Sequence, residues 1–371
     1  MRPFSLLIKP ASADCNMNCR YCFYLEKSSL YPDHKIHRMS EDTLERVVSS
    51  YMETGQPCYT FGWQGGEPTL MGTDFFRSAV TFQEKYGRPG SVVSNGLQTN
   101  ATLVDEDTAR FLAQYNFLVG VSLDGPRHIH DHYRMFFNGQ GTFNRVIKGI
   151  EVLKKTGVQF NILVLVSDNN HQSAREIYRF LLHQGFYYHQ YIPCVEHDSK
   201  GRLEPYSITG EQWGVFLTEL FRQWYPDDID RVSIRLFDSI LNYLVNGRPN
   251  ICHMENNCCQ YFVIEYNGDI YPCDFFVRKE LLLGNIHTHS WGEVLDSARY
   301  REFGEAKSGF GYLCSACRYV GLCHGDCLKH RFFMPGSASR LSTLCSGWKM
   351  FFTDTLHIFE DIAYSIKARQ A

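Results

Sequence analysis

Short apolar runs alternate with longer amphipathic segments over the first 230 residues of the chain. Segment 117–123 is apolar at nearly every position, which is typical of a strand buried on both faces of a parallel sheet. Segment 143–157 instead places its apolar side chains at helical intervals and ends at Gly157. The pair predicts a strand followed by a helix, and the same order recurs along the chain.

The sequence predicts six such pairs of a strand and a helix. The predicted strands are 5–8, 59–63, 91–94, 117–123, 158–166 and 186–192. The predicted helices are 40–55, 75–80, 105–114, 143–157, 173–183 and 211–224. Alternating strands and helices imply a parallel sheet with right-handed crossovers, and six units suggest an incomplete barrel. We therefore predict an α/β fold whose first domain, residues 1–230, is a partial (β/α)6 TIM-like barrel.

The composition changes after residue 250. Nine cysteines lie within fewer than a hundred residues, and two β-prone runs flank Asn267-Gly268, a strong signal for a hairpin turn. We predict that residues 231–371 form a second, small domain that is built around metal, contains a β-hairpin and ends in a helix.

Polar, glycine-rich and cysteine-rich segments follow the predicted strands. In barrels of this kind the chemistry occurs on the loops at the carboxyl ends of the strands. The segments at these positions are the 15–22 loop, 64–68, 98–100, Ser122 with Asp124, and Cys194 with Val195. We expect the functional site there.

Composition and charge exclude several classes of partner. The 371 residues include 37 Lys and Arg against 40 Asp and Glu, and the net charge of -3 gives no reason to expect nucleic acid. No apolar run approaches the roughly 18 residues needed to cross a bilayer. Fourteen cysteines at ligand-like spacings, without an apolar signal segment, favour a reducing cytoplasm over a disulfide framework.

The loop after the first strand contains Cys15, Cys19 and Cys22. Three thiolates can bind three irons of a 4Fe-4S cube and leave the fourth iron open to a small molecule. The alternatives are a zinc knuckle or three unrelated core thiols, but three close cysteines without a fourth ligand fit structural zinc poorly.

The C-x3-C-x2-C spacing, with an aromatic residue before the last cysteine, resembles the cluster loop of radical S-adenosylmethionine (SAM) enzymes. The Gly-Gly-Glu-Pro segment after the second strand resembles the part that holds the methionine amino group in that family. The resemblance implies SAM as cosubstrate and a 5′-deoxyadenosyl radical. The residues it implies as cofactor contacts are Tyr21, Gly66, Ser122, Arg134 and Val195.

Two features fit this resemblance less well. The family often has glycine after Gln-Thr-Asn, and this chain has Ala101 there. Arg134 follows His128, His130 and His132, for which a solvated surface is the simpler interpretation. We expect these three histidines to face solvent.

The C-terminal cysteines resemble the SPASM extension of radical enzymes that modify peptides, and their order resembles that of anaerobic sulfatase-maturating enzymes. The resemblance implies two auxiliary 4Fe-4S clusters, and so three clusters in all. One auxiliary cluster would be bound by Cys252, Cys258, Cys273 and Cys327. The other would be bound by Cys314, Cys317, Cys323 and Cys345. Cys259 could replace Cys258, and a zinc ribbon is the alternative for the 314–327 cysteines; Cys58 and Cys194 are left as ordinary thiols.

Asp274 follows a presumed cluster ligand within the aromatic segment 271–276. Such an aspartate most often caps a turn, but the segment resembles the one that bears the proton-accepting aspartate of sulfatase maturases. The resemblance implies oxidation of a cysteine or serine to Cα-formylglycine, with Asp274 as general base. The implied partners are an unfolded or nascent sulfatase with a Cys/Ser-x-Pro-x-Arg motif and an electron donor such as flavodoxin or ferredoxin.

Two other functions remain open from the sequence. Another SPASM-type maturase, forming thioether or carbon-carbon crosslinks in a ribosomal peptide, would share every cluster but need not use Asp274. A non-catalytic zinc or iron-sulfur protein would explain the cysteines but not the polar residues at the ends of six strands.

Overall fold

The computed structural model describes residues 2–332 and 341–370, and these divide into two compact units. The first unit contains Met1–Ser122, Tyr133–Phe160 and Cys259–Phe303. The second contains Leu123–His132, Asn161–Cys258 and Gly304–Ala371. None of the helices in the described ranges is long and apolar enough to cross a membrane.

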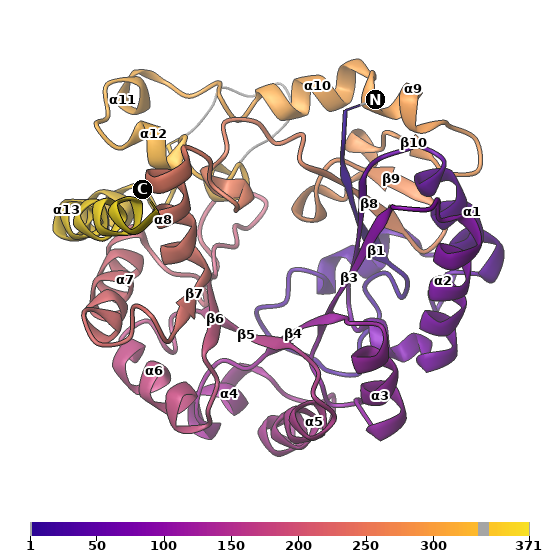
Figure 1. The fold of residues 1–371 in the computed structure, drawn as a ribbon, viewed down its shortest axis with the longest axis horizontal. Coiled ribbons are helices and arrows are strands. Elements are labelled where there is room, and N and C mark those ends of the chain that lie inside the picture. Colours follow the sequence, from indigo (N-terminus) through magenta and orange to yellow (C-terminus); the bar gives the residue numbers. More distant parts are fainter. Residues whose placement is uncertain (1, 333–340, 371) are drawn as a thin grey trace. The chain divides into compact units, whose positions relative to one another are not determined.

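The first unit contains four parallel strands, each followed by a helix. In chain order these elements are β1 (Ser5–Lys9), α1 (Glu41–Met52), β2 (Cys58–Trp63), α2 (Thr73–Tyr86), β3 (Val92–Thr99), α3 (Glu106–Gln114), β4 (Leu118–Ser122) and α5 (Phe143–Thr156). The later segments add β8 (Tyr261–Glu265), β9 (Asp269–Tyr271), β10 (Gly284–Asn285), α9 (Trp291–Leu295) and α10 (Ala298–Glu305). Helices α1, α2 and α3 lie along the outer side of these strands (Figure 1).

Helix α1 shows why the predicted pattern folds in this way. The Ser40 hydroxyl accepts a hydrogen bond from the Thr43 backbone N–H, which caps the first turn. Leu44, Val47 and Tyr51 are fully buried on one face of the helix. One apolar stripe therefore both forms the helix and fixes the face that packs on the strands.

The predicted hairpin is present and extends the sheet. Strands β8 and β9 pair antiparallel around Gly268, whose φ is +87°. Strand β8 also pairs in parallel with β1, with Leu6 opposite Phe262. The strand order in this unit is therefore β10-β9-β8-β1-β2-β3-β4, and the start of the cysteine-rich region shares the sheet of the first strands.

Strand β3 was predicted too short. It continues to Thr99, past Asn95-Gly96, and pairs in parallel with β2 and β4. The Asn95 amide oxygen accepts hydrogen bonds from Trp63 Nε1 and Gln83 Nε2, each at 3.0 Å. These tertiary partners keep in the sheet a dipeptide whose local preference is a turn.

The second unit contains the remaining strands. Its elements are α4 (Arg127–Tyr133), β5 (Phe160–Val166), α6 (Ala174–His183), β6 (Tyr188–Pro193), α7 (Gly210–Trp224), β7 (Ser233–Ile234), α8 (Arg235–Asn246), α11 (Tyr312–Ser315), α12 (Val320–Cys323) and α13 (Cys345–Gln370). Strands β5, β6 and β7 are parallel. The predicted C-terminal helix is α13, which packs against α7 and α8 (Figure 1).

Candidate active site

The three-cysteine loop begins directly after β1. Cys19 is buried, whereas Cys15 and Cys22 are partly exposed. The backbone N–H of Asn18 donates to the Met135 carbonyl at 2.8 Å, and that of Arg20 donates to the Tyr133 carbonyl at 3.2 Å. The loop is thus fixed by backbone bonds on a second segment, which is what a rigid cluster site requires.

The glycines after β2 lie against this loop. A Cβ on Gly66 would stand 2.0 Å from the Asp14 carbonyl oxygen, and Gly65 has a φ of +124°. The Gly66 N–H donates to the Ser12 carbonyl at 2.8 Å. Only glycine lets the two loops approach so closely.

Glu67, which the sequence did not single out, joins the strand ends. Its buried carboxylate accepts hydrogen bonds from both the N–H and the hydroxyl of Thr69, from the Thr99 hydroxyl and from the Asn100 N–H, at 2.6–3.1 Å. Burial raises the pKa of Glu67, although these hydrogen bonds act to lower it. The sequence did contain a signal for this network. A glutamate precedes a proline at the end of one strand, and Thr-Asn follows at the end of the next.

Asn100 continues this network to the cysteine loop. Its side-chain amide donates to the Asn16 Oδ1 at 2.9 Å, and the Asn16 amide donates to the Thr102 hydroxyl at 2.8 Å. Ala101, where the family often has glycine, adopts a left-handed φ of +59° and is fully buried. The loop keeps the glycine-like backbone despite the substitution.

The predicted cofactor contacts lie in both units. Arg134 and Tyr21 are buried in the first unit, where the Arg134 guanidinium donates to the Tyr21 hydroxyl at 3.1 Å. Ser122, at the end of β4, accepts from the Gln98 amide at 3.1 Å. Val195 is fully buried after β6 in the second unit. Their contact with SAM stays a prediction.

The expectation for the histidines was wrong for one of the three. His128 and His132 are exposed, but His130 is fully buried, and its Nδ1 accepts a hydrogen bond from the Asp124 N–H at 3.3 Å. His130 therefore holds the backbone after β4 and does not belong to a solvated surface.

Asp274 does not cap a turn. Its buried carboxylate accepts hydrogen bonds at Oδ2 from the Tyr24 hydroxyl and from the Gln64 amide, the latter at 3.2 Å. Oδ1 has no hydrogen-bond partner in the described residues. Burial and the adjacent carboxylate raise the pKa of Tyr24, so this tyrosine keeps its proton and donates it. Oδ2 is thus fixed by two donors, whereas Oδ1 accepts no hydrogen bond from the described residues.

Two lysines and a glutamate complete the surroundings of Asp274. Lys9 ends β1 with its ammonium 2.5 Å from Glu265 Oε1 and 3.8 Å from Asp274 Oδ1. Lys27 donates to the Asp274 backbone carbonyl, and burial lowers its pKa to about 7. Neither lysine was predicted, although Lys9 stands at the carboxyl end of a predicted strand.

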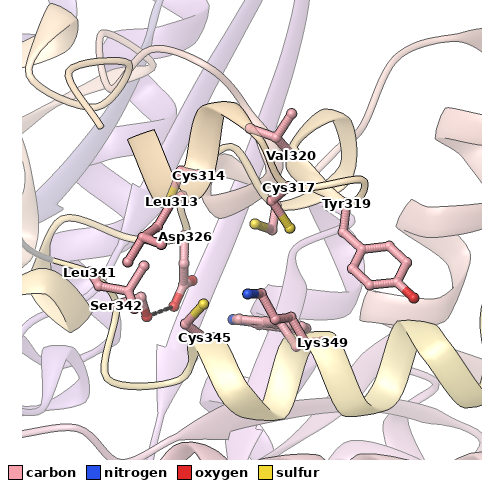
Figure 2. Close-up of a pocket in the computed structure, with 13 residues that line it drawn as sticks. Leu313, Cys314, Cys317, Tyr319, Val320, Asp326, Leu341, Ser342, Cys345 and Lys349 are labelled. Atoms are coloured by element: carbon pink, nitrogen blue, oxygen red, sulfur yellow. Dashed lines mark hydrogen bonds between the residues drawn. The ribbon is translucent and has the colours of Figure 1, made fainter. Parts of the chain in front are cut away.

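Four of the predicted cluster ligands line one cavity in the second unit. Cys314, Cys317, Cys323 and Cys345 line this cavity, and Figure 2 shows the Cys317 and Cys345 sulfurs directed into it. The donor set fits a 4Fe-4S cube with four thiolate ligands.

The described part of the chain also shows whether side chains come together to bind a single metal ion. There, no three His, Cys, Asp or Glu side chains converge closely enough to hold a metal ion. A four-iron cube places each cysteine on a different iron, so its sulfurs stay farther apart than the four ligands of one zinc.

Comparison with known proteins identifies the family. The radical SAM superfamily model matches residues 10–181, and the SPASM iron-sulfur cluster-binding domain matches 252–318. The chain is 35% identical to the serine-type anaerobic sulfatase-maturating enzyme of Bacteroides thetaiotaomicron, over 95% of this chain and 89% of the relative. It is 36% identical to the cysteine-type enzyme of Clostridium novyi, over 100% of both chains. The chain belongs to the anaerobic sulfatase-maturating enzymes.

The structure of another maturase agrees with this. Native anSMEcpe with bound AdoMet and Cp18Cys peptide matches with a TM-score of 0.91 at 36% identity, over 99% of this chain and 100% of that chain. The predicted fold class, a partial barrel of β/α units followed by a SPASM module, is confirmed. This maturase is thus a radical SAM enzyme with iron-sulfur clusters, and a non-catalytic metal protein is excluded. The boundary at residues 230–231 stays a prediction.

The sequence left open whether Cys258 or Cys259 is a cluster ligand in this maturase, and the structure bears on this choice. The Cys259 thiol donates to the Tyr300 carbonyl at 3.2 Å. That contact is typical of a protonated thiol and favours Cys258 as the cluster ligand. Cys194 is buried, as predicted for an ordinary thiol, and Cys58 is exposed.

Proposed function

We propose that this chain oxidises a cysteine or serine side chain in a sulfatase polypeptide to Cα-formylglycine. Family membership supports the reaction class. The observation that carries the proposal is the Asp274 carboxylate, buried with Oδ2 fixed by Tyr24 and Gln64 and with Oδ1 lacking a hydrogen-bond partner in the described residues.

The iron-sulfur clusters and SAM, when bound, supply the radical that removes a hydrogen atom from the target Cβ and the path that takes up the remaining electron. The protein supplies the proton acceptor: Oδ1 of Asp274 takes the proton from the target thiol or hydroxyl. The target side chain thereby loses one hydrogen atom, one proton and one electron. A serine yields the aldehyde directly, and a cysteine yields a thioaldehyde that water converts to the aldehyde with release of H₂S.

The residues around Asp274 orient it for this step. Tyr24 and Gln64 both donate to Oδ2, so the carboxylate cannot rotate freely, and Oδ1 keeps its capacity to accept a proton. The Lys9 ammonium, 3.8 Å from Oδ1, offsets the negative charge of the ionised base without a hydrogen bond to it. Glu265 pairs with Lys9 at 2.5 Å and so balances the buried cation.

We further propose three 4Fe-4S clusters. Cys15, Cys19 and Cys22 would hold the one that binds SAM, with Tyr21, Gly66, Ser122, Arg134 and Val195 as cofactor contacts. Cys252, Cys258, Cys273 and Cys327 would hold one auxiliary cluster. Cys314, Cys317, Cys323 and Cys345 would hold the other, and the cavity they line supports this assignment.

The substrate and the reductant are proposed from the same chemistry. A relative's structure holds a peptide, which supports a polypeptide substrate. We propose an unfolded or nascent sulfatase with a Cys/Ser-x-Pro-x-Arg motif as that substrate, and a flavodoxin or ferredoxin as electron donor. A crosslinking peptide maturase would not need the Asp274 arrangement, and the family favours the sulfatase function.

The test is turnover of a peptide by anaerobically prepared, cluster-loaded enzyme. With SAM, a reductant and a Cys-x-Pro-x-Arg or Ser-x-Pro-x-Arg peptide, mass spectrometry should show the aldehyde product together with 5′-deoxyadenosine. Asp274→Asn should still cleave SAM but lose at least 10²-fold in aldehyde formation, the lower end of a general-base contribution. Full turnover by Asp274→Asn would refute the base, and a crosslinked product would refute the function.

A further inference from the structure

A strained loop in the second unit separates two of the predicted cluster ligands, Cys323 and Cys327. Its residues His324, Gly325 and Asp326 have φ values of +42°, +72° and +66°. Non-glycine residues adopt this region rarely and at a cost in free energy, so neighbouring contacts must hold it.

Two buried cations supply those contacts. Arg331 donates to the backbone carbonyls of His324 at 2.7 Å, of Gly325 at 2.6 Å and of Asp326 at 3.1 Å. The Lys307 ammonium donates to the Asp326 carbonyl at 2.8 Å. Both side chains are almost fully buried. The loop is thereby fixed through its backbone, so the Asp326 carboxylate is not needed to hold it.

The Asp326 carboxylate is 1% exposed and lines the cavity of Cys314, Cys317, Cys323 and Cys345. Its Oδ2 accepts from the Ser342 hydroxyl at 2.6 Å and lies 2.9 Å from the His330 Nδ1. Its Oδ1 is buried with no hydrogen-bond partner among the described residues. Figure 2 shows the carboxylate beside Cys345 with one oxygen bonded to Ser342. A buried acceptor without a partner is rare in native proteins and calls for an explanation.

We propose that Asp326 lowers the reduction potential of the auxiliary cluster that these four cysteines would hold. This inference rests on the proposed cluster assignment. One-electron reduction adds a negative charge to the cluster, and a carboxylate in the same low-dielectric cavity opposes that charge. The reduced cluster would then pass its electron more readily to another of the proposed clusters.

The buried cations near this carboxylate offset part of the effect, but none in the described residues donates to Oδ1. His330 faces Oδ2, on the other side of the carboxylate group, and Lys307 and Arg331 donate to backbone carbonyls. Lys349 also lines the cavity, but its side chain is exposed, and water screens its charge more than that of a buried group.

The test is a redox titration of the full-length, cluster-loaded protein with dithionite, followed by electron paramagnetic resonance. Asp326→Asn keeps the size of the side chain and removes its charge, and asparagine also tolerates a positive φ. We expect one of the three cluster signals to move to higher potential, with its reduction equilibrium changed at least tenfold, which is 59 mV for a one-electron couple. The other two signals should not move.

Two controls make the outcome decisive. Asp361→Asn removes the same charge from an exposed position of α13 and should leave all three potentials unchanged. Ser342→Ala removes a donor to Oδ2 but keeps the carboxylate, so no signal should move to higher potential. An unchanged or lower potential in Asp326→Asn would overturn the proposal, as would loss of iron, which would assign Asp326 to cluster retention. Because potentials are measured without peptide, failure here leaves the proposed reaction untouched, and aldehyde formation tests that reaction separately.

Discussion

Two buried carboxylates of the first unit differ in what their oxygens contact. Both oxygens of Glu67 accept hydrogen bonds, from Thr69, Thr99 and Asn100, so this side chain serves only to hold strand ends together. Asp274 has donors on Oδ2 alone. The filled acceptor positions therefore distinguish these two acids, whereas burial does not, because both are almost fully buried. Glu265 also has one oxygen without a hydrogen-bond partner in the described residues, but its other oxygen pairs with Lys9.

Gly66→Ala should cost the enzyme its first cluster. The added Cβ would stand 2.0 Å from the Asp14 carbonyl oxygen, so the loop of Cys15, Cys19 and Cys22 must move. Iron analysis should fall from about twelve to about eight per chain, and SAM cleavage should be lost. In the control Gly96→Ala the new Cβ meets its nearest atom only at 3.8 Å, and iron content should be retained. Full iron content in Gly66→Ala would contradict this prediction, because it would show that the loop can move and still bind the cluster.

His189 should make the stability of the protein depend on pH. Burial lowers its pKa from 6.5 to about 4, while its Nε2 lies 3.0 Å from the Phe186 carbonyl oxygen. As the pH falls through 6.5 the unfolded chain takes up the proton first, so stability present above pH 6.5 is lost toward pH 4. By pH 5 the loss is about 2 kcal/mol.

The measurement is denaturant unfolding of wild type and His189→Gln at pH 7 and pH 5 under anaerobic conditions. The wild type should lose about 2 kcal/mol more than the variant on acidification. His128→Gln, at an exposed position, should behave as the wild type. Equal losses of unfolding free energy in wild type and His189→Gln would contradict the lowered pKa of His189.

At the scale of helices and strands, the contact between α7 and α13 depends on glycine. A Cβ on Gly347 would stand 2.0 Å from the Gly210 carbonyl oxygen and 2.8 Å from the Gly214 nitrogen. These are backbone atoms, which cannot rotate away as a side chain would. Gly347→Ala should therefore destabilise the protein by about 1–3 kcal/mol, the usual cost of overpacking.

The matched control is Gly311→Ala in the same unit, where a new Cβ has no neighbour within 4 Å. Thermal unfolding of both variants should show a lowered midpoint only for Gly347→Ala. Equal midpoints would mean that the two helices separate without cost.

The pattern of apolar residues was enough to predict six strands with their helices, because each element buries one face or both. It failed where tertiary contacts decide the structure. Asn95-Gly96 stays in β3 because Trp63 and Gln83 bond the asparagine, and β8 joins β1 through pairing between distant segments. Nothing in the neighbouring sequence indicates either of these contacts.

The site was predicted in part, for a related reason. Cysteine spacing and a glycine pair point to chemistry by themselves, so the cluster loop and Gly66 could be named from the sequence. Lys9, Tyr24 and Glu265 carry no motif, and only the fold brings them to Asp274. A lysine in a strand is normally exposed, and its burial here follows from Glu265, some 250 residues away in the chain.

For the whole molecule, the open question that the structure sharpens is which cysteine completes the first auxiliary cluster. Cys258→Ala should lower iron from about twelve to about eight per chain, whereas Cys259→Ala should keep about twelve, since the Cys259 thiol is engaged with the Tyr300 carbonyl at 3.2 Å. Anaerobic iron and sulfide analysis of the two variants, prepared side by side, distinguishes them. The reverse result would make Cys259 the ligand, and its thiol would then have to leave Tyr300 when the cluster is inserted.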